Sequence, residues 1–117
     1  MQDFRKIEAW KLSRPLVVAV YSATRRFPID ERFGLTLQLR KSVSSIGANI
    51  AEAMGRATRA DCARVLQTSV SEGNETLHHL LTALDLGYLA QAEFDEITAL
   101  LEPVRQKTFN LLMSLRR

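Results

Sequence analysis

The chain has 117 residues and a formal net charge of +3, with 46% hydrophobic and 25% charged residues. These values are typical of a folded soluble protein and exclude an intrinsically disordered chain. No apolar run approaches the roughly 18 residues that cross a bilayer, and the N-terminus lacks the apolar stretch of a signal peptide. We therefore expect a single domain over residues 1–117, located in the cytoplasm and without membrane contact.

Charge is distributed unevenly along the chain. Residues 1–64 carry twelve Lys and Arg against six Asp and Glu, whereas residues 65–117 carry four against seven. This pattern indicates a surface for a polyanion or head-to-tail attraction between copies, although ordinary solvated faces would also produce it. The one cysteine, Cys62, cannot form an intramolecular disulfide, and we expect it to be a small apolar core residue in a reducing compartment.

The first predicted helix spans residues 7–26. Pro15 lacks an amide N–H, so we expect it to kink this helix or to mark a start near Ser13. Pro28 should end the helix, because the residue before a proline is pushed out of the helical region. One apolar face follows helical spacing, namely Trp10, Val17, Val20, Tyr21, Thr24 and Phe27. A second apolar stripe lies on another side, namely Leu12, Leu16, Ala19 and Ala23.

The second predicted helix spans residues 31–55. Asp30 is a suitable N-cap for it, and Gly55 is a suitable terminator. One face carries large apolar residues at spacings of three and four, namely Leu35, Leu39, Val43, Ile46, Ile50 and Met54. A second stripe contains more small residues, namely Phe33, Leu37, Ser44, Ala48 and Ala51.

The third and fourth predicted helices span residues 59–87 and 92–116. Thr58 should cap the start of the third helix, and Gly87 should cap its end. The apolar stripe of the third helix is Leu66, Val70, Gly73, Leu77, Leu80, Leu81, Leu84 and Tyr88. The stripe of the fourth follows the heptad rule and consists of Phe94, Ile97, Leu101, Val104, Thr108, Leu111 and Leu115. Because this spacing continues beyond Pro103, we expect that proline to bend the helix without ending it.

Four such helices joined by short loops predict an all-α fold, an antiparallel up-down-up-down four-helix bundle. A helix that buries only one face is polar elsewhere. The second apolar stripes on the first two helices therefore predict that copies of the chain pack against each other. The residues expected at this oligomer interface are Leu12, Leu16, Phe33 and Leu37.

One motif, Glu75-x-x-His78, raises the possibility of metal chemistry. Di-iron bundles place two such motifs on two helices and add two further inward glutamates. This chain has only His78 and His79, which are adjacent, so a second motif is impossible within one subunit. No glycine-rich phosphate loop and no recognisable Ser-His-Asp grouping occur. We therefore expect no enzymatic activity, no cofactor and no metal site.

Basic residues around the second and third predicted helices are the remaining functional candidates. A cluster of arginine and lysine side chains can bind the phosphates of a nucleic acid. The five candidates are Arg40, Lys41, Arg56, Arg59 and Arg64. The alternative is that these side chains form structural salt bridges, within one subunit or between subunits, with glutamates such as Glu52 and Glu72.

Short motifs along nearly the whole chain, taken in order and spacing, resemble a known family. They include Phe4-x-x-Ile7-x-Ala9-Trp10, Phe33-Gly34-Leu35, Ser45-Ile46, Gly55-Arg56 and Leu86-Gly87-Tyr88. On these motifs the chain is similar to the four-helix-bundle proteins encoded within intervening sequences of 23S rRNA genes, a family that includes the accessory protein of diversity-generating retroelements.

This resemblance implies a homopentamer shaped like a barrel or funnel, whose basic character lets it bind DNA or RNA. It implies no enzymatic role. The leading hypothesis is therefore an oligomeric protein that binds nucleic acid. The alternative is a structural or protein-interaction accessory subunit, in which the charges organise the subunit interface or receive a partner such as a reverse transcriptase.

Overall fold

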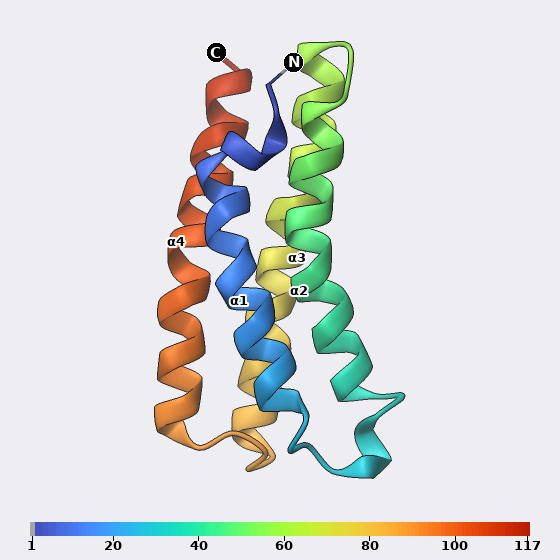
Figure 1. Ribbon diagram of the computed structural model, residues 1–117, viewed down its shortest axis with the longest axis vertical. Coiled ribbons are helices and arrows are strands. Elements are labelled where there is room, and N and C mark those ends of the chain that lie inside the picture. The colour runs from blue at the N-terminus through green and yellow to red at the C-terminus, as the bar shows by residue number, and fades with distance from the viewer. Residues whose placement is uncertain (1) are drawn as a thin grey trace.

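The computed structural model describes residues 2–117, and this part of the chain is all-helical, with no strand. Two short 3₁₀ helices accompany four long α-helices (Figure 1). In chain order the elements are η1 (Phe4–Lys6), α1 (Glu8–Thr24), η2 (Ile29–Glu31), α2 (Leu35–Met54), α3 (Arg59–Asp85) and α4 (Gln91–Leu115). The four long helices lie close to the predicted ranges, and the largest difference is at the start of α2.

Each long helix packs against two others. Helix α1 contacts α2 and α4, and α3 contacts the same two helices. Successive helices lead to opposite ends of a molecule that measures 43 × 25 × 20 Å (Figure 1). One end, called here the termini end, therefore holds the N-terminal segment, the α2–α3 connector and the C-terminus. The other, called the far end, holds the α1–α2 and α3–α4 connectors.

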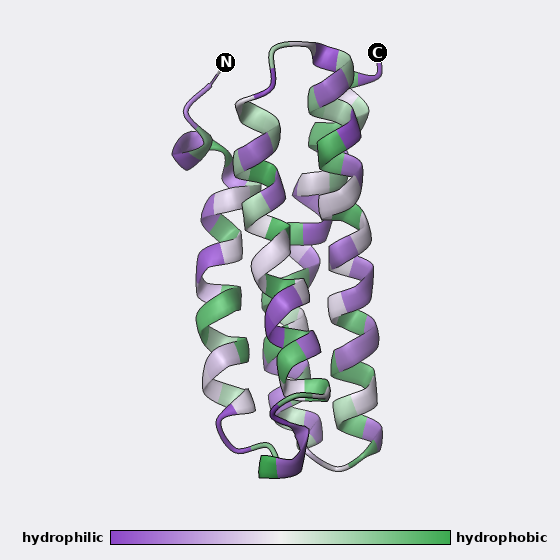
Figure 2. Cartoon of the chain, turned by 90° about the vertical axis from the view of Figure 1, so that its right-hand side faces the viewer, coloured by the Kyte–Doolittle hydropathy of each residue, from purple (hydrophilic) through white to green (hydrophobic). Residues whose placement is uncertain are grey.

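The core lies between the four helices. Each helix is amphipathic, because it carries both hydrophobic and hydrophilic residues (Figure 2). The large side chains that are almost completely buried are Leu16, Val20, Leu39, Val43, Ile46, Ile50, Leu66, Leu80, Leu101, Val104 and Leu112. Burying a side chain of this size contributes about 1.5–3 kcal/mol. Most of these residues belong to the predicted core stripes, whereas Tyr21 and Leu81, which were also expected there, are exposed.

The start of α2 differs from the sequence prediction. Asp30 was expected to cap a helix beginning at residue 31, but Asp30 lies within η2, and α2 begins at Leu35. The capping group is the side chain of Glu31, whose Oε1 accepts a hydrogen bond from the backbone N–H of Leu35 at 3.1 Å. Glu31 Oε2 also accepts a hydrogen bond from the Tyr88 hydroxyl at 2.9 Å, which raises the pKa of Tyr88. Glu31 thus joins the two connectors of the far end.

The predicted caps of α3 are confirmed. At its start, Thr58 Oγ1 accepts a hydrogen bond from the backbone N–H of Asp61 at 3.1 Å. At its end, Gly87 has a φ of +78°. The backbone N–H of Gly87 donates to Leu84 at 3.0 Å, and that of Tyr88 donates to Ala83 at 2.9 Å. This pair of hydrogen bonds is the Schellman motif, which requires a left-handed residue that glycine adopts without strain.

Small and polar residues let the helices approach closely. A Cβ atom on Gly47 of α2 would lie 2.8 Å from Ser13 Oγ of α1. Between α2 and α3, Ser69 donates to the backbone carbonyl of Ile46 at 2.8 Å, and Thr76 donates to Ser42 Oγ at 3.0 Å. Every buried side-chain nitrogen and oxygen of the described residues has a hydrogen-bond partner.

Two prolines lie inside helices rather than at their ends. Helix α1 continues through Pro15, so of the two expected outcomes a start near Ser13 is wrong. Helix α4 continues through Pro103, as the unbroken apolar spacing predicted. None of the helices described here combines the length and the apolar character that crossing a membrane requires.

Candidate nucleic-acid interface

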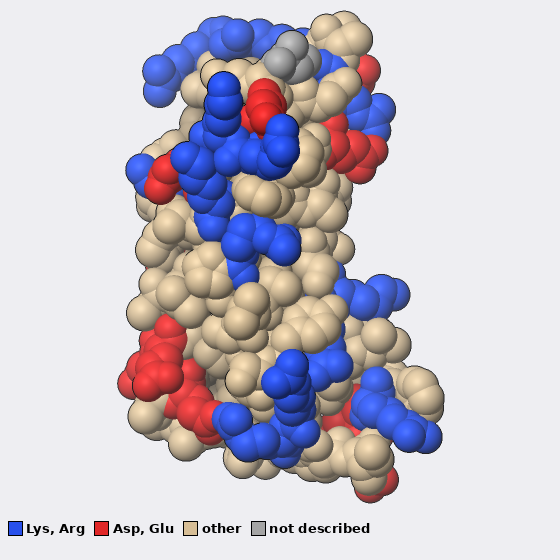
Figure 3. Space-filling model, in the orientation of Figure 1, with Lys and Arg blue, Asp and Glu red and all other residues tan. Residues whose placement is uncertain are grey.

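Basic side chains cover much of the termini end, and a second basic group lies toward the far end beside acidic side chains (Figure 3). Three segments meet at the termini end, namely residues 2–14, 52–64 and 116–117. Together they carry nine Lys and Arg against four Asp and Glu, a net charge of +5, while the rest of the chain carries seven against nine. The basic side chains are Arg5, Lys6, Lys11, Arg14, Arg56, Arg59, Arg64, Arg116 and Arg117. The fold thus places the excess positive charge on one end.

The N-terminal segment is fixed to α1 by aromatic packing. The rings of Phe4 and Trp10 meet edge to face with centroids 5.1 Å apart, and the Arg14 guanidinium lies 5.2 Å from the Trp10 ring. Arg5 pairs with Asp3 at 2.7 Å, which lowers the pKa of that carboxyl. This packing orders η1 and leaves the Lys6 side chain exposed at the termini end.

Arg59, one of the five predicted residues, has a clear structural role. Its guanidinium donates to the backbone carbonyl of Leu115 at 3.0 Å and to that of Ser114 at 2.7 Å. These carbonyls lie in the last turn of α4, where the helix dipole favours a cation. Arg116 ties the same helix end to α3 through Gln67 Oε1 at 3.1 Å. Both guanidinium groups remain exposed enough to meet a phosphate as well.

Arg56 and Arg64 also lie at the termini end, and each is paired with an acid of its own segment. Arg56 pairs with Glu52, and Arg64 lies 3.5 Å from Asp61. Ion pairs this exposed contribute at most about 1 kcal/mol. They therefore do not prevent either arginine from binding a phosphate instead.

Arg40 and Lys41 lie elsewhere, so the predicted cluster of five is divided. They stand in the first turns of α2, about 20 Å along the helix axis from its end at Met54. Arg40 Nε donates to Thr24 Oγ1 at 2.8 Å, and its guanidinium lies 4.6 Å from the Tyr21 ring. Arg40 therefore links α2 to α1, and the prediction that it shares one surface with Arg56, Arg59 and Arg64 is wrong.

Basic residues at the two ends of the chain were not among the predicted candidates. Lys6 and Lys11 are exposed and form no ion pair among residues 2–117. Arg116 and Arg117 are the last two residues, and the C-terminus lies at the same end of the molecule as the N-terminus (Figure 1). An even number of helices in alternating directions returns the C-terminus to the end where the chain started. Had the charges been summed for each end of the predicted bundle, instead of for each half of the sequence, these residues would have been identified as candidates.

The four predicted interface residues differ in their burial. Leu16 is fully buried in the core of its own subunit, so the expectation that it contacts another copy is wrong. Leu12 is half-buried and packs against the same core. Phe33 and Leu37 are exposed by 76% and 38%, and they remain available for a contact between copies.

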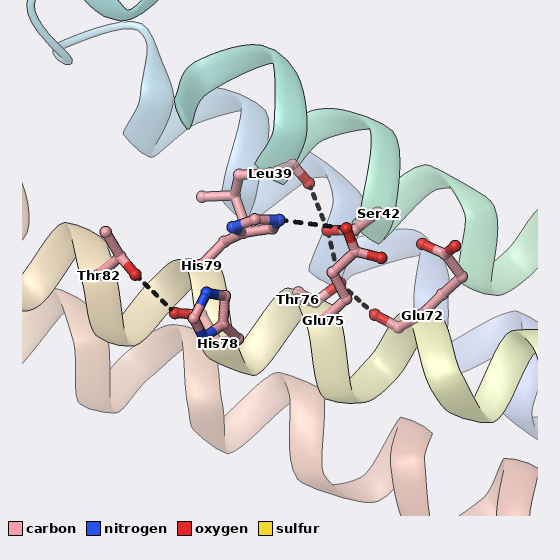
Figure 4. A network of polar contacts seen from close by, with 8 residues as sticks. All are labelled: Leu39, Ser42, Glu72, Glu75, Thr76, His78, His79 and Thr82. Carbon is pink, nitrogen blue, oxygen red and sulfur yellow. Dashed lines mark hydrogen bonds and ion pairs between the residues drawn. The ribbon is translucent and has the colours of Figure 1, made fainter. Parts of the chain in front are cut away.

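The Glu75-x-x-His78 motif lies on α3 beside a polar network (Figure 4). Glu75 contacts His79 rather than His78, at 3.4 Å, and the two histidine rings lie 5.3 Å apart. Burial and the neighbouring Glu75 raise the pKa of Glu72. No three His, Cys, Asp or Glu side chains within the described range are close enough to hold a metal ion.

Cys62 is buried as predicted, and this burial raises the pKa of its thiol.

Residues 5–110 match the family described as 23S rRNA-intervening sequence protein. The chain belongs to this family. No curated protein matches it. A solved structure from Bacteroides thetaiotaomicron VPI-5482 is similar, with a TM-score of 0.82 and 23% sequence identity over 90% of this chain and 95% of that one. That protein is described as one of unknown function from the S23 ribosomal protein family, so the likeness shows the fold of this 23S rRNA-intervening sequence protein and not its activity.

Proposed function

We propose that this protein is a non-enzymatic, oligomeric four-helix bundle that binds RNA or DNA through its termini end. The observation that carries the proposal is the concentration of nine Lys and Arg against four Asp and Glu at that end. Nucleic acids are bound chiefly by neutralising phosphates, and this does not depend on base sequence. A basic end of this kind suits such binding.

The subunit in this proposal has antiparallel up-down-up-down topology, and the assembly is the homopentamer that the family resemblance implies. The exposed side chains of Phe33 and Leu37 support contacts between copies. A ring of five parallel subunits would place five termini ends on one rim. Because each end carries +5, the rim would carry +25. Pooling charge in this way raises both the affinity and its dependence on salt.

The proposal is tested by measuring how a fluorescent RNA and a fluorescent DNA bind at increasing salt. The test variant is Lys6→Gln/Lys11→Gln, and the matched control is Arg25→Gln/Lys41→Gln, which removes the same charge outside the termini end. All four side chains are exposed, so folding should be retained. We expect only the test variant, and not the control, to bind several-fold more weakly than the parent. Its slope of log affinity against log salt concentration should be shallower by about one for each phosphate that the removed lysines would have neutralised.

Two results would contradict this function. One is the absence of binding by the parent protein at low salt, as measured by fluorescence anisotropy. The other is equal weakening by the test and control variants, because only net charge, and not the termini end, would then matter.

A second candidate function is an accessory subunit for a protein partner such as a reverse transcriptase. The observation that favours it is the exposure of large apolar side chains at the far end, where Phe33 is 76% and Ile29 is 73% exposed. Pull-down from the native host with and without nuclease separates the two functions. A partner retained after nuclease treatment supports the accessory subunit, whereas one released with the nucleic acid supports the first proposal.

A further inference from the structure

Exposed apolar side chains follow one side of α1 and α2. Val18 and Tyr21 are one helical turn apart on α1, whereas Phe33 lies two residues before α2 and Leu37 lies in the first turn of α2. Their exposed fractions are 68%, 37%, 76% and 38%. Arg40, one turn after Leu37, stacks on the Tyr21 ring and so links α1 to the start of α2 on this side. We call these four residues the α1–α2 face. A surface of this kind is typical of an interaction site.

The α1–α2 face has a basic border. The Arg32 guanidinium lies 4.8 Å from the Phe33 ring, and that of Arg40 lies 4.6 Å from the Tyr21 ring. Lys41 is exposed beside them and forms no ion pair among residues 2–117. A partner for this face should therefore combine apolar groups with negative charge.

The same chain carries a surface with that complementary character. A groove of about 290 Å³ lies between α1 and α4, with Ala23 and Ile97 among its lining residues. Glu93 and Glu96 border it, together with the exposed Leu100 and with Arg26, which pairs with Glu93. From residue 91 to residue 102, α4 has four acidic residues and no Lys or Arg. We call this the α1–α4 groove.

The two surfaces lie at the same level of the molecule. The groove involves the last turns of α1 and the first turns of α4, and the α1–α2 face includes the start of α2, all toward the far end. In Figure 3, acidic side chains gather over the lower part of α4, and basic ones lie beside them at a similar height. Two copies standing side by side with parallel axes would therefore bring opposite charges together.

We infer that the α1–α2 face of one copy docks into the α1–α4 groove of a second copy, with Phe33 as the inserted side chain. This inference rests on the self-association in the proposed function and assigns its surfaces. The contact is heterologous, so each added copy leaves one face and one groove free until a ring closes. Nucleic acid does not suit the groove, because Glu96, which forms no ion pair among residues 2–117, would repel phosphates.

The experiment uses one variant for each surface, without nucleic acid. Phe33→Asp places a negative charge on the face, and Glu96→Arg/Leu100→Arg places positive charge at the groove. We expect each variant alone to sediment as a 13.2 kDa monomer. An equimolar mixture should form dimers or larger assemblies, because the intact groove of one variant accepts the intact face of the other and the introduced aspartate can pair with the introduced arginines. Leu86→Asp, at a 54% exposed residue outside both surfaces, should keep the parent assembly.

Several outcomes would overturn the inference. They are a monomeric parent, a variant that keeps the parent assembly, and a mixture that stays monomeric although both variants have the parent's circular dichroism. Should the double substitution reduce helicity, Glu96→Arg alone replaces it in the same mixture. Because nucleic acid is absent, a failure of the parent to bind RNA would overturn the proposed function without affecting this result.

Discussion

Gly47 sets how closely α1 and α2 approach each other. The fully buried Ser13 occupies the space that a Cβ on Gly47 would enter, and its hydroxyl donates to the Trp10 carbonyl at 2.6 Å. A serine held in this way cannot easily move aside. The glycine therefore serves packing, although it weakens the helix that contains it.

We predict that Gly47→Ala destabilises the protein by about 1 kcal/mol, because overpacking a core outweighs the better helix propensity of alanine. Adding Ser13→Ala should restore most of this stability, since the nearest remaining Ser13 atom, Cβ, lies 3.7 Å from the added methyl. Urea unfolding of the parent, both single variants and the double variant measures the coupling. Strictly additive effects would show that the two residues do not share this space.

At the scale of elements, glycine also determines where α3 ends. Gly87 has a φ of +78°, whereas Gly55, which follows α2, has a φ of −90° that any residue can adopt. A Cβ on Gly87 would meet no atom within 4 Å, and one on Gly55 would make only ordinary contact at 3.5 Å. Space is therefore available at both positions, and only the backbone conformation distinguishes them.

This difference gives a prediction with its own control. Gly87→Ala should lower the free energy of unfolding by about 1 kcal/mol, the cost of a left-handed conformation for an L-residue. Gly55→Ala should leave stability unchanged or raise it by up to about 1 kcal/mol, because it restricts the unfolded chain. Thermal unfolding of the two variants checks both values, and a decrease of equal size in each would contradict the assigned role of φ.

Helix positions could be predicted from the sequence because apolar spacing and local caps determine them. Thr58 and Gly87 act within their own turns, and both were identified correctly. The start of α2 could not be predicted in this way. Its cap is a side chain four residues earlier, and that side chain, Glu31, is also fixed by Tyr88, which is 57 residues away in the chain. Asp30 satisfied the local rule but had no such partner.

At the scale of the whole molecule, the candidate site was predictable only in part. Arg56, Arg59 and Arg64 were identified because they lie close together in sequence around one connector. Lys6 and Arg117 were missed because only the complete fold brings the two ends of the chain to that connector. Leu16 was wrongly placed at an interface, because spacing alone does not show whether the second stripe of α1 faces a neighbouring helix of the same subunit.

The two proposals together make a prediction about the assembled molecule. The Phe33→Asp variant keeps the whole termini end but should not assemble, so it presents +5 rather than the pooled charge of several copies. We expect it to bind RNA at least tenfold more weakly than the parent and with a shallower salt slope, because it contacts fewer phosphates. Fluorescence anisotropy at two or more salt concentrations measures this. If the variant has the same salt slope as the parent, one subunit is sufficient to make all the phosphate contacts, and the prediction is wrong.

The shared location of the two chain ends limits how this molecule can be handled. A purification tag or fluorescent protein fused to either end would stand over the cations assigned to the nucleic acid and could mask them. Attachment near the α3–α4 connector avoids this, because the molecule is 43 Å long and that turn is at its other extreme. With Cys62 only 1% exposed, a cysteine introduced there should react with a thiol-directed dye while the native thiol stays shielded.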